Sequence, residues 1–377
     1  MKKILAAFLL LLPFLPLLAL RSGDKMRPPV DIKWLRGNLP EPVERDAAGR
    51  TKYRIFTFLL THTANSPETV MMLNGLVSRD DVAGIAVITP DPASDAEAFL
   101  ERLPKTAVSF GVDKSRRTTG TYMAGSILYP MAFVIDPDGL IVWNGEAVDL
   151  PEFLDGLRGK PADVSRQRRI AEKLDELQTL MRGSELRRMR HLADEIFRLD
   201  PGSAPALRMM LFVLESSGRI PEAWDILASQ LDAAPRKARI YYAALDMISR
   251  HAALRKELPG VIGRFLENVK SPEAFDVMVW TLLDRFTFDA AALEGAVRLY
   301  EAGGRLPGSG GRSPAAAAGR CAAGALLAAR LGQFPKAVEL QKQAARHWRA
   351  AGSASAAANA EKTAAYFELC GKTSVKW

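Results

Sequence analysis

Cysteine is scarce in this sequence, and its scarcity limits the chemistry open to the chain. Only two cysteines, Cys321 and Cys370, occur among 377 residues. Residues 314–331 and 355–370 are predicted to form parallel helices, with a third helix at 335–350 between them. An α-helix rises about 1.5 Å per residue, so the two thiols lie roughly 10 Å or more apart along the axis, beyond disulfide reach. We therefore expect two unpaired thiols.

Clusters typical of metal, phosphate or acyl-transfer sites are also missing. His191, His251 and His347 lie on predicted helices without a cysteine or carboxylate partner at metal-ligand spacing. Residues 308–311 are rich in glycine but lack the preceding strand and the lysine of a phosphate-binding loop. No serine–histidine–aspartate arrangement can be identified. The sequence therefore predicts no metal and no cofactor.

The charge is positive and unevenly distributed. The chain has a formal net charge of +8, with 48% hydrophobic and 25% charged residues, which is typical of globular domains. Residues 301–377 contain 11 Lys and Arg against 4 Asp and Glu. Basic surfaces bind anionic lipid or nucleic acid in some proteins, but no nucleic-acid recognition motif accompanies this one. We expect a solvated basic helix face and no nucleic-acid partner.

Residues 1–20 have the pattern of a secretory signal or a membrane anchor. Lys2 and Lys3 precede an apolar run that continues to Leu20. The run is short for a membrane span and ends without the small residues of a cleavage site, so cleavage and retention both stay open. In either case we expect the rest of the chain in the cell envelope, outside the cytoplasmic membrane. Residues 21–45, rich in Pro, Arg and Lys, are predicted to be a tether.

Residues 46–160 alternate apolar strands with helical segments. Strands are predicted at 53–60, 82–89, 106–111, 131–135 and 140–143, and helices at 67–78, 94–101 and from 150 onward. The continuous apolar runs suit central strands covered on both faces. Asp136 to Gly139 form a strong hairpin turn between the last two strands. This order predicts an α/β domain with a mixed sheet flanked by helices.

The strand at 53–60, the turn after it and the strand pair after Pro130 resemble the thioredoxin-like fold. The resemblance is to membrane-tethered thiol-disulfide oxidoreductases, or redoxins, which carry Cys-x-x-Cys between this strand and the next helix. Here the four positions begin with Thr63 and end with Ser66. A hydroxyl supplies neither the thiolate nor the resolving thiol of dithiol exchange. The resemblance therefore implies a scaffold that has lost its redox pair, with Thr63, Ser66 and Pro130 as degenerate active-site positions.

The same resemblance implies a peptide-binding groove. In the family, the proline that matches Pro130 follows a cis bond and borders a groove that holds extended peptide by strand addition. Tyr129 precedes this proline and His62 lies beside the altered turn, so both are candidate partner contacts. Thr57 occupies the position of a buried carboxylate in many relatives. The alternative is that Pro130 and His62 have no partner and Ser66 only caps a helix.

A second pattern begins near residue 164, where the predicted strands end. Pro201 and Pro235 each follow a predicted helix, and the interval between them, about 34 residues, is the period of tetratricopeptide repeats. A glycine followed five residues later by an alanine, at Gly218 and again at Gly332, ends one helix and allows the next to cross it closely. These segments resemble tetratricopeptide repeats.

The repeats are predicted to occupy two stretches. Residues 164–300 form the first, with degenerate units between 239 and 300, and residues 315–377 form a C-terminal segment. A flexible, glycine-rich loop at 303–314 separates them.

The first helices of the repeats are the second candidate site. Stacked helix pairs bind partners along the face that their first helices form. Arg208 and Phe212 lie on one predicted first helix, and Tyr241 and Tyr242 lie on the next. The alternative is that Phe212 and one tyrosine belong to the core, since each such helix also buries a face.

The sequence thus predicts a multidomain protein, an α/β thioredoxin-like domain followed by an all-helical tetratricopeptide-like domain. The function it favours is non-catalytic: an exported or membrane-tethered scaffold that binds a protein or peptide partner. The alternative is an oxidoreductase of the same family with a divergent active site.

Overall fold

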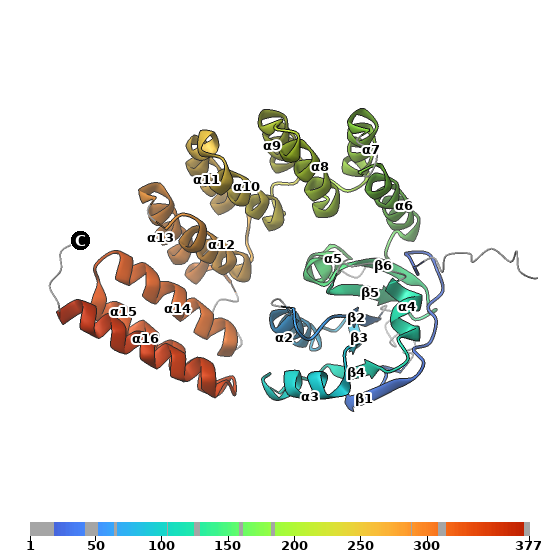
Figure 1. The fold of residues 1–377 in the computed structure, drawn as a ribbon, viewed down its shortest axis with the longest axis horizontal. Helices are drawn as coiled ribbons and strands as arrows, with labels where there is room; N and C mark the ends of the chain where they lie inside the picture. Colours follow the sequence, from blue (N-terminus) through green and yellow to red (C-terminus); the bar gives the residue numbers. More distant parts are fainter. Residues whose placement is uncertain are drawn as a thin grey trace, which may run out of the picture. The chain divides into compact units, whose positions relative to one another are not determined.

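The computed structural model describes residues 19–41, 52–63, 66–103, 105–123, 129–157, 161–181, 185–287, 289–307 and 314–372 (Figure 1). The chain divides into two compact units, unit 1 at residues 1–171 and unit 2 at residues 172–377. Unit 1 contains a mixed sheet with helices, whereas unit 2 is helical. The predicted fold class, an α/β domain followed by an all-helical domain, is confirmed.

One mixed sheet forms the centre of unit 1. Its strands are β1 (Ile32–Arg36), β2 (Tyr53–Phe58), β3 (Val82–Thr89), β4 (Ser109–Asp113), β5 (Met131–Ile135) and β6 (Ile141–Glu146), in the order β1-β4-β3-β2-β5-β6. β2, β3 and β4 are parallel neighbours, whereas β1, β5 and β6 pair antiparallel with theirs. The carboxyl ends of the parallel strands therefore meet the start of β5 at one edge of the sheet.

The alternating side chains of β2 fill two hydrophobic cores. Ile55 and Leu59 point to one face of the sheet and Phe56 and Phe58 to the other. The first face is covered by α2 (Ser66–Leu76), α3 (Ala93–Glu101) and α5 (Leu150–Leu157), which follows the short helix η1 (Ala147–Asp149). The second is covered by α4 (Arg117–Met123), whose Tyr122 packs on Phe58 with ring centroids 5.1 Å apart. Both faces are buried, which explains the continuous apolar runs.

The tether prediction for residues 21–45 is wrong over much of its described part. Residues 32–36 form β1, which pairs antiparallel with β4 at the edge of the sheet. Upstream, Ser22 donates backbone and side-chain hydrogen bonds to Asn144 Oδ1 at 2.9 and 3.0 Å. The prolines that favoured a tether flank the strand and do not interrupt it. Residues 42–45 lie outside the described residues.

Gly111 on β4 provides a test of how β1 packs against its neighbouring strand. A Cβ at Gly111 would approach Ile32 Cγ2 to 2.4 Å and the Trp34 ring to 3.0 Å. Gly111→Ala should therefore lower the free energy of unfolding by about 1–3 kcal/mol, the usual cost of overpacking. Gly75→Ala is the control, because no heavy atom lies within 4 Å of its Cβ position and alanine favours the helix by about 0.5–1 kcal/mol. Urea unfolding measures both, and equal midpoints would contradict this packing.

Antiparallel helix pairs form unit 2, preceded by α6 (Val164–Leu180), which crosses the boundary between the units. The helices that follow are α7 (Leu186–Leu199), α8 (Ala204–Ser216), α9 (Ile220–Ala233), α10 (Ala238–Arg250), α11 (Leu258–Asn268), α12 (Pro272–Arg285), α13 (Ala290–Arg305), α14 (Pro314–Arg330), α15 (Phe334–Ala350) and α16 (Ala354–Lys372). Figure 1 shows α8, α10 and α12 side by side, with α9, α11 and α13 beyond them in a second row.

The helix starts keep the repeat period that the sequence predicts. α8, α10 and α12 begin at Ala204, Ala238 and Pro272, in two equal steps that match one tetratricopeptide period each. The segment predicted to be degenerate therefore folds as two regular pairs, α10–α11 and α12–α13. Within the first of these pairs, the short helix η2 (Ala252–Glu257) takes the place of the first turns of the second helix, so the repeat length is unchanged.

The prediction of a flexible loop at 303–314 is wrong for its first three residues. Gly303 to Arg305 form the last turn of α13, and Gly303 is buried where a Cβ would approach Phe275 Cβ to 2.7 Å. The sequence pattern favoured a linker here, but close helix packing requires one of these glycines. α14 begins at Pro314, more than one repeat period after the start of α12 at Pro272. Additional residues therefore do intervene, and 308–313 lie outside the described residues.

The described part of the chain has no helix that is both long enough and apolar enough to cross a membrane. The predicted signal or anchor at residues 1–20 lies outside the described residues, except for Ala19 and Leu20. Leu20 is buried in the core on the Phe56 face of the sheet.

Candidate functional site

The turn after β2 brings the two hydroxyls at the predicted degenerate positions together. Thr63 Oγ1 and Ser66 Oγ lie 2.6 Å apart, and each is within hydrogen-bond distance of the Leu60 carbonyl, at 3.0 and 2.6 Å. Ser66 is the buried first residue of α2. These hydroxyls fasten the turn to the end of β2, and neither can form a thiolate.

An aspartate that the sequence analysis missed lies beside this turn. Asp91 Oδ2 accepts hydrogen bonds from the backbone N–H and the hydroxyl of Thr61 at 2.6 and 2.7 Å. His62 Nδ1 lies 3.8 Å from the same oxygen, and its side chain is 72% exposed. Asp91 closely follows β3, whose carboxyl end meets that of β2 at one edge. Comparing the residues after the two strands would have found it.

Pro130, the third of the predicted degenerate positions, lies at the same edge of the sheet. The Tyr129–Pro130 peptide bond is cis, and the carbonyl of Pro130 accepts a hydrogen bond from Ala147 N at 3.0 Å. Burial raises the pKa of the Tyr129 hydroxyl, and the nearby Asp91 carboxylate raises it further. The structure therefore gathers His62, Thr63, Ser66, Tyr129 and Pro130 where β2 ends and β5 begins.

Dithiol exchange is not available to this arrangement, which leads to a direct prediction. Cys321 and Cys370, both on helices of unit 2, are not joined in a disulfide, and burial raises the pKa of the Cys321 thiol. A raised pKa leaves less thiolate near neutral pH, so this cysteine is a poor nucleophile. The purified chain should reduce insulin no faster than buffer does. Turnover that survives in a Cys321→Ser/Cys370→Ser variant would contradict the prediction.

The second candidate site is a groove between α8 and α10. It encloses a volume of about 440 Å³. Its lining residues are Ala204, Leu207, Arg208, Leu211, Phe212 and Glu215 from α8, with Arg239, Ile240, Tyr242, Ala243, Asp246 and Arg250 from α10. These are consecutive first helices of the repeat pairs, so the groove lies on the face that the sequence analysis selected.

Three of the four residues predicted on this face line the groove, and one does not. Arg208 and Tyr242 are lining residues, as is Phe212, which is 61% exposed. Tyr241 is fully buried, its hydroxyl donates to the Pro235 carbonyl at 2.8 Å, and it is therefore a core residue. The prediction of Tyr241 as a partner contact is wrong, because adjacent helical residues point about 100° apart and only one can face the groove.

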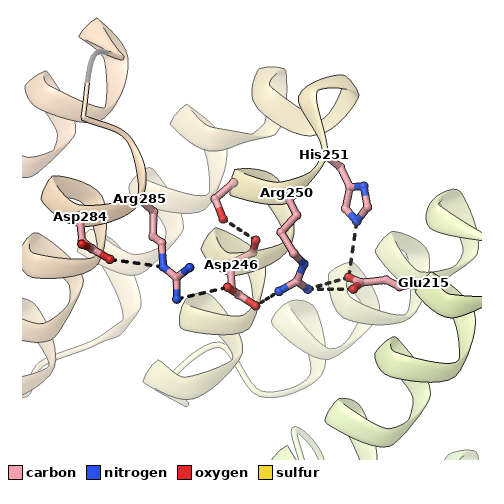
Figure 2. Close-up of polar contacts among 7 residues, drawn as sticks. Glu215, Asp246, Arg250, His251, Asp284 and Arg285 are labelled. Atoms are coloured by element: carbon pink, nitrogen blue, oxygen red, sulfur yellow. Dashed lines mark hydrogen bonds and ion pairs between the residues drawn. The ribbon is translucent and has the colours of Figure 1, made fainter. Parts of the chain in front are cut away.

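A network of ion pairs joins α8, α10 and α12 at one end of the groove (Figure 2). Both carboxylate oxygens of Glu215 accept from Arg250 Nη2 at 2.9 Å, and Arg250 also bonds Asp246. Arg285 Nη2 lies 3.8 Å from Asp246 Oδ1, and His251 Nε2 lies 3.8 Å from Glu215 Oε1. Single exposed ion pairs contribute little, but a network holds its helices in fixed register. The groove is therefore preformed.

The equal spacing of the first helices reveals why the groove is hollow. Phe212, Asp246 and Trp280 occupy equivalent positions on α8, α10 and α12, as do Met209, Ala243 and Val277 on the same helices. Ala243 is the smallest of its set and leaves space on α10. On the flanking helices, Phe212, Val277 and Trp280 are 61%, 47% and 38% exposed. Aligning the helices at this period would have identified Trp280, which the sequence analysis missed.

Comparisons with known proteins give little further information. No protein-family model and no curated protein matches the chain. One solved structure that matches is a tetratricopeptide repeat protein from Parabacteroides merdae ATCC 43184, at 14% sequence identity and a TM-score of 0.21. The match covers 55% of this chain and 100% of that one. This superposition is too weak to bear on function.

Proposed function

We propose that this protein binds another polypeptide in the groove between α8 and α10, and acts as an interaction or scaffold protein. The observation that carries the proposal is the coincidence of a preformed cavity of about 440 Å³ with exposed large apolar side chains on the same helices and their neighbour. Singly exposed apolar residues are ordinary on protein surfaces, but a cluster beside a hollow is typical of an interaction site.

The energetics favour a partner that covers this cluster. Removing apolar surface from water contributes roughly 25 cal/mol per Å², and aromatic side chains are among the commonest anchors of interfaces. The ion pair between Glu215 on α8 and Arg250 on α10 is already formed, so binding requires little ordering of the groove, and preorganisation of this kind favours affinity. Phe212 is therefore the first residue to test.

Selection from a library of random displayed peptides, with the full chain as bait, tests the proposal. Peptides that bind the natural chain should bind Phe212→Ser about tenfold more weakly or worse, a loss of about 1.4 kcal/mol. Tyr366→Ser is the matched control, because Tyr366 is 64% exposed, like Phe212 at 61%, but lies on α16. Equal binding to the natural chain and Phe212→Ser, or a loss confined to Tyr366→Ser, would overturn the proposal.

We also propose that unit 1 is a thioredoxin-like domain without its redox pair. The order of its strands and the proline beside the turn support this reading. An oxidoreductase with a divergent active site, the alternative function, requires a reactive group at the turn, and the hydroxyls of Thr63 and Ser66 are bonded to each other. The insulin assay above separates the two.

Placement of the protein in the cell envelope is a further part of the proposal, supported by the basic start and apolar run of residues 1–20. Membrane attachment through this segment is part of the same proposal. A reporter that is active only outside the cytoplasm should give signal when fused after unit 1. Activity of a cytoplasmic reporter at that junction would contradict the placement.

A further inference from the structure

We infer that the segment bound in the α8–α10 groove carries a bulky apolar side chain with a carboxylate close to it in sequence. The inference rests on the proposed function and specifies the chemistry of the partner. Two features of the lining support it: an apolar notch at Ala243, and a pair of arginines on one side of this notch.

The notch is suited to a large apolar side chain. Its floor is formed by Leu207, Leu211 and Ile240, which are almost fully buried, and Ala243 leaves it open. Phe212 forms a wall. An apolar cavity of about 150 Å³ holds a benzene ring, so a groove of about 440 Å³ admits a phenylalanine, tryptophan or leucine side chain together with adjoining backbone.

The charge around the notch favours an anion. Arg239 lies four residues before Ala243 on α10, an offset of about 6 Å along the helix axis. By the equal spacing of the first helices, Arg208 on α8 is level with Tyr242, one residue before Ala243, so both arginines lie on the N-terminal side of the notch. Arg239 also lies in the first turn of α10, at the positive N-terminal end of that helix. Both arginines contact other residues of the chain, but a guanidinium has five N–H donors, so one partner does not saturate it.

Three of the four nearby carboxylates are paired with other arginines. Of the five charged lining residues three are arginines, and the two acids, Glu215 and Asp246, are both bonded to Arg250 at the other side of the notch. Two further acids lie near Tyr242. Asp276 pairs with Arg320, whereas Glu273 accepts a hydrogen bond from the uncharged Ser271 hydroxyl and keeps its negative charge.

The distances set the spacing of the expected motif. Consecutive Cα atoms of an extended peptide are about 3.8 Å apart, so an offset of up to about 6 Å places the carboxylate one or two positions along the chain from the apolar anchor. An acidic group placed there would meet Arg208 and Arg239 while the anchor fills the notch.

Fluorescence polarisation with synthetic peptides tests this chemistry on the full chain. The probes are labelled Gly/Ser peptides with one central Phe and two adjacent Asp, the same peptide with Lys for Asp, and the same peptide with Ala for Phe. The Phe–Asp probe should bind about tenfold more tightly than either relative. Ala243→Trp, which fills the notch, should weaken its binding by a similar factor.

A charge-reversal experiment tests whether Arg208 and Arg239 recognise the carboxylate of the peptide. Arg208→Glu/Arg239→Glu should invert the preference, so that the Phe–Lys probe binds more tightly than Phe–Asp. Arg187→Glu/Arg298→Glu changes two exposed arginines on α7 and α13 and should leave the preference unchanged. Circular dichroism and melting of each variant confirm that it folds, and a reversal pair that unfolds is replaced by Arg208→Gln/Arg239→Gln, which should abolish the preference.

The outcomes separate the inference from the proposed function. Binding of Phe probes regardless of their charge, blocked by Ala243→Trp, overturns the inference and leaves the groove as the binding site. Failure of every probe, while the library selection yields groove-dependent peptides, also overturns the inference alone. Failure of both experiments overturns the proposed function as well.

Discussion

Asp276→Ala should lower the free energy of unfolding of unit 2 by about 1.5–3 kcal/mol, the range for a hydrogen bond to a charged group, because it removes the carboxylate partner of a largely buried guanidinium. Arg320 Nη1 lies 2.7 Å from Asp276 Oδ1, and the two side chains are only 14% and 17% exposed. The guanidinium also lies over the Tyr300 ring, 4.2 Å from its centroid, and donates to the Tyr300 carbonyl. These contacts join α12, α13 and α14, so the whole C-terminal part of the repeat unit depends on them.

An exposed ion pair of the same geometry provides the control. Arg264 Nη1 lies 2.6 Å from Asp232 Oδ1, but these side chains are 49% and 68% exposed. Asp232→Ala should cost at most about 1 kcal/mol, since exposed pairs contribute little. Chemical unfolding followed by circular dichroism measures both variants. Equal losses for the buried and the exposed aspartate would show that burial of Arg320 does not control the stability.

Tyr241→Ala should lower the free energy of unfolding by about 3–5 kcal/mol, the usual cost of truncating a buried aromatic side chain. Tyr241 is fully buried and meets Phe265 edge to face, with centroids 5.3 Å apart. Tyr241→Phe keeps this packing and loses the hydrogen bonds of the hydroxyl, to the Pro235 carbonyl and to Asn268, so its cost should be about 1–2 kcal/mol.

Phe212→Ala, the matched substitution on the groove side, should affect binding and leave the stability almost unchanged. Phe212→Ala removes a side chain that is 61% exposed, so it should change the free energy of unfolding by no more than about 0.5 kcal/mol. Its effect should instead be seen in partner binding. A large loss of stability in Phe212→Ala, or a small one in Tyr241→Ala, would mean that the helix faces are assigned wrongly.

The regular elements could be predicted from the sequence because their signals are local. Apolar runs and the Asp136–Gly139 turn located β2, β3, β5 and β6, and the tetratricopeptide period located the repeat pairs. β1 was not predicted, because its position depends on pairing with β4, which is distant in the sequence, and on space that Gly111 leaves for Ile32 and Trp34.

The candidate sites were predictable only in part, for a related reason. The sequence placed Tyr241 and Tyr242 on one helix, but which of them faces the groove depends on how α10 packs against both α8 and α12. Asp91 and Trp280 come from separate segments that only the sheet edge and the repeat register bring beside the other residues. Contacts that depend on such long-range packing have no local sequence pattern.

Site-specific photo-crosslinking in the cells that produce the protein tests the central claim most directly. A photoreactive benzoylphenylalanine replaces Phe212 or Trp280 beside the groove, or Tyr366 on α16 as a control of similar exposure to Phe212. We predict that the Phe212 and Trp280 positions give the same polypeptide adduct, identified by mass spectrometry, and that the Tyr366 position does not. Adducts from the Tyr366 position alone, or none from either groove position, would contradict it.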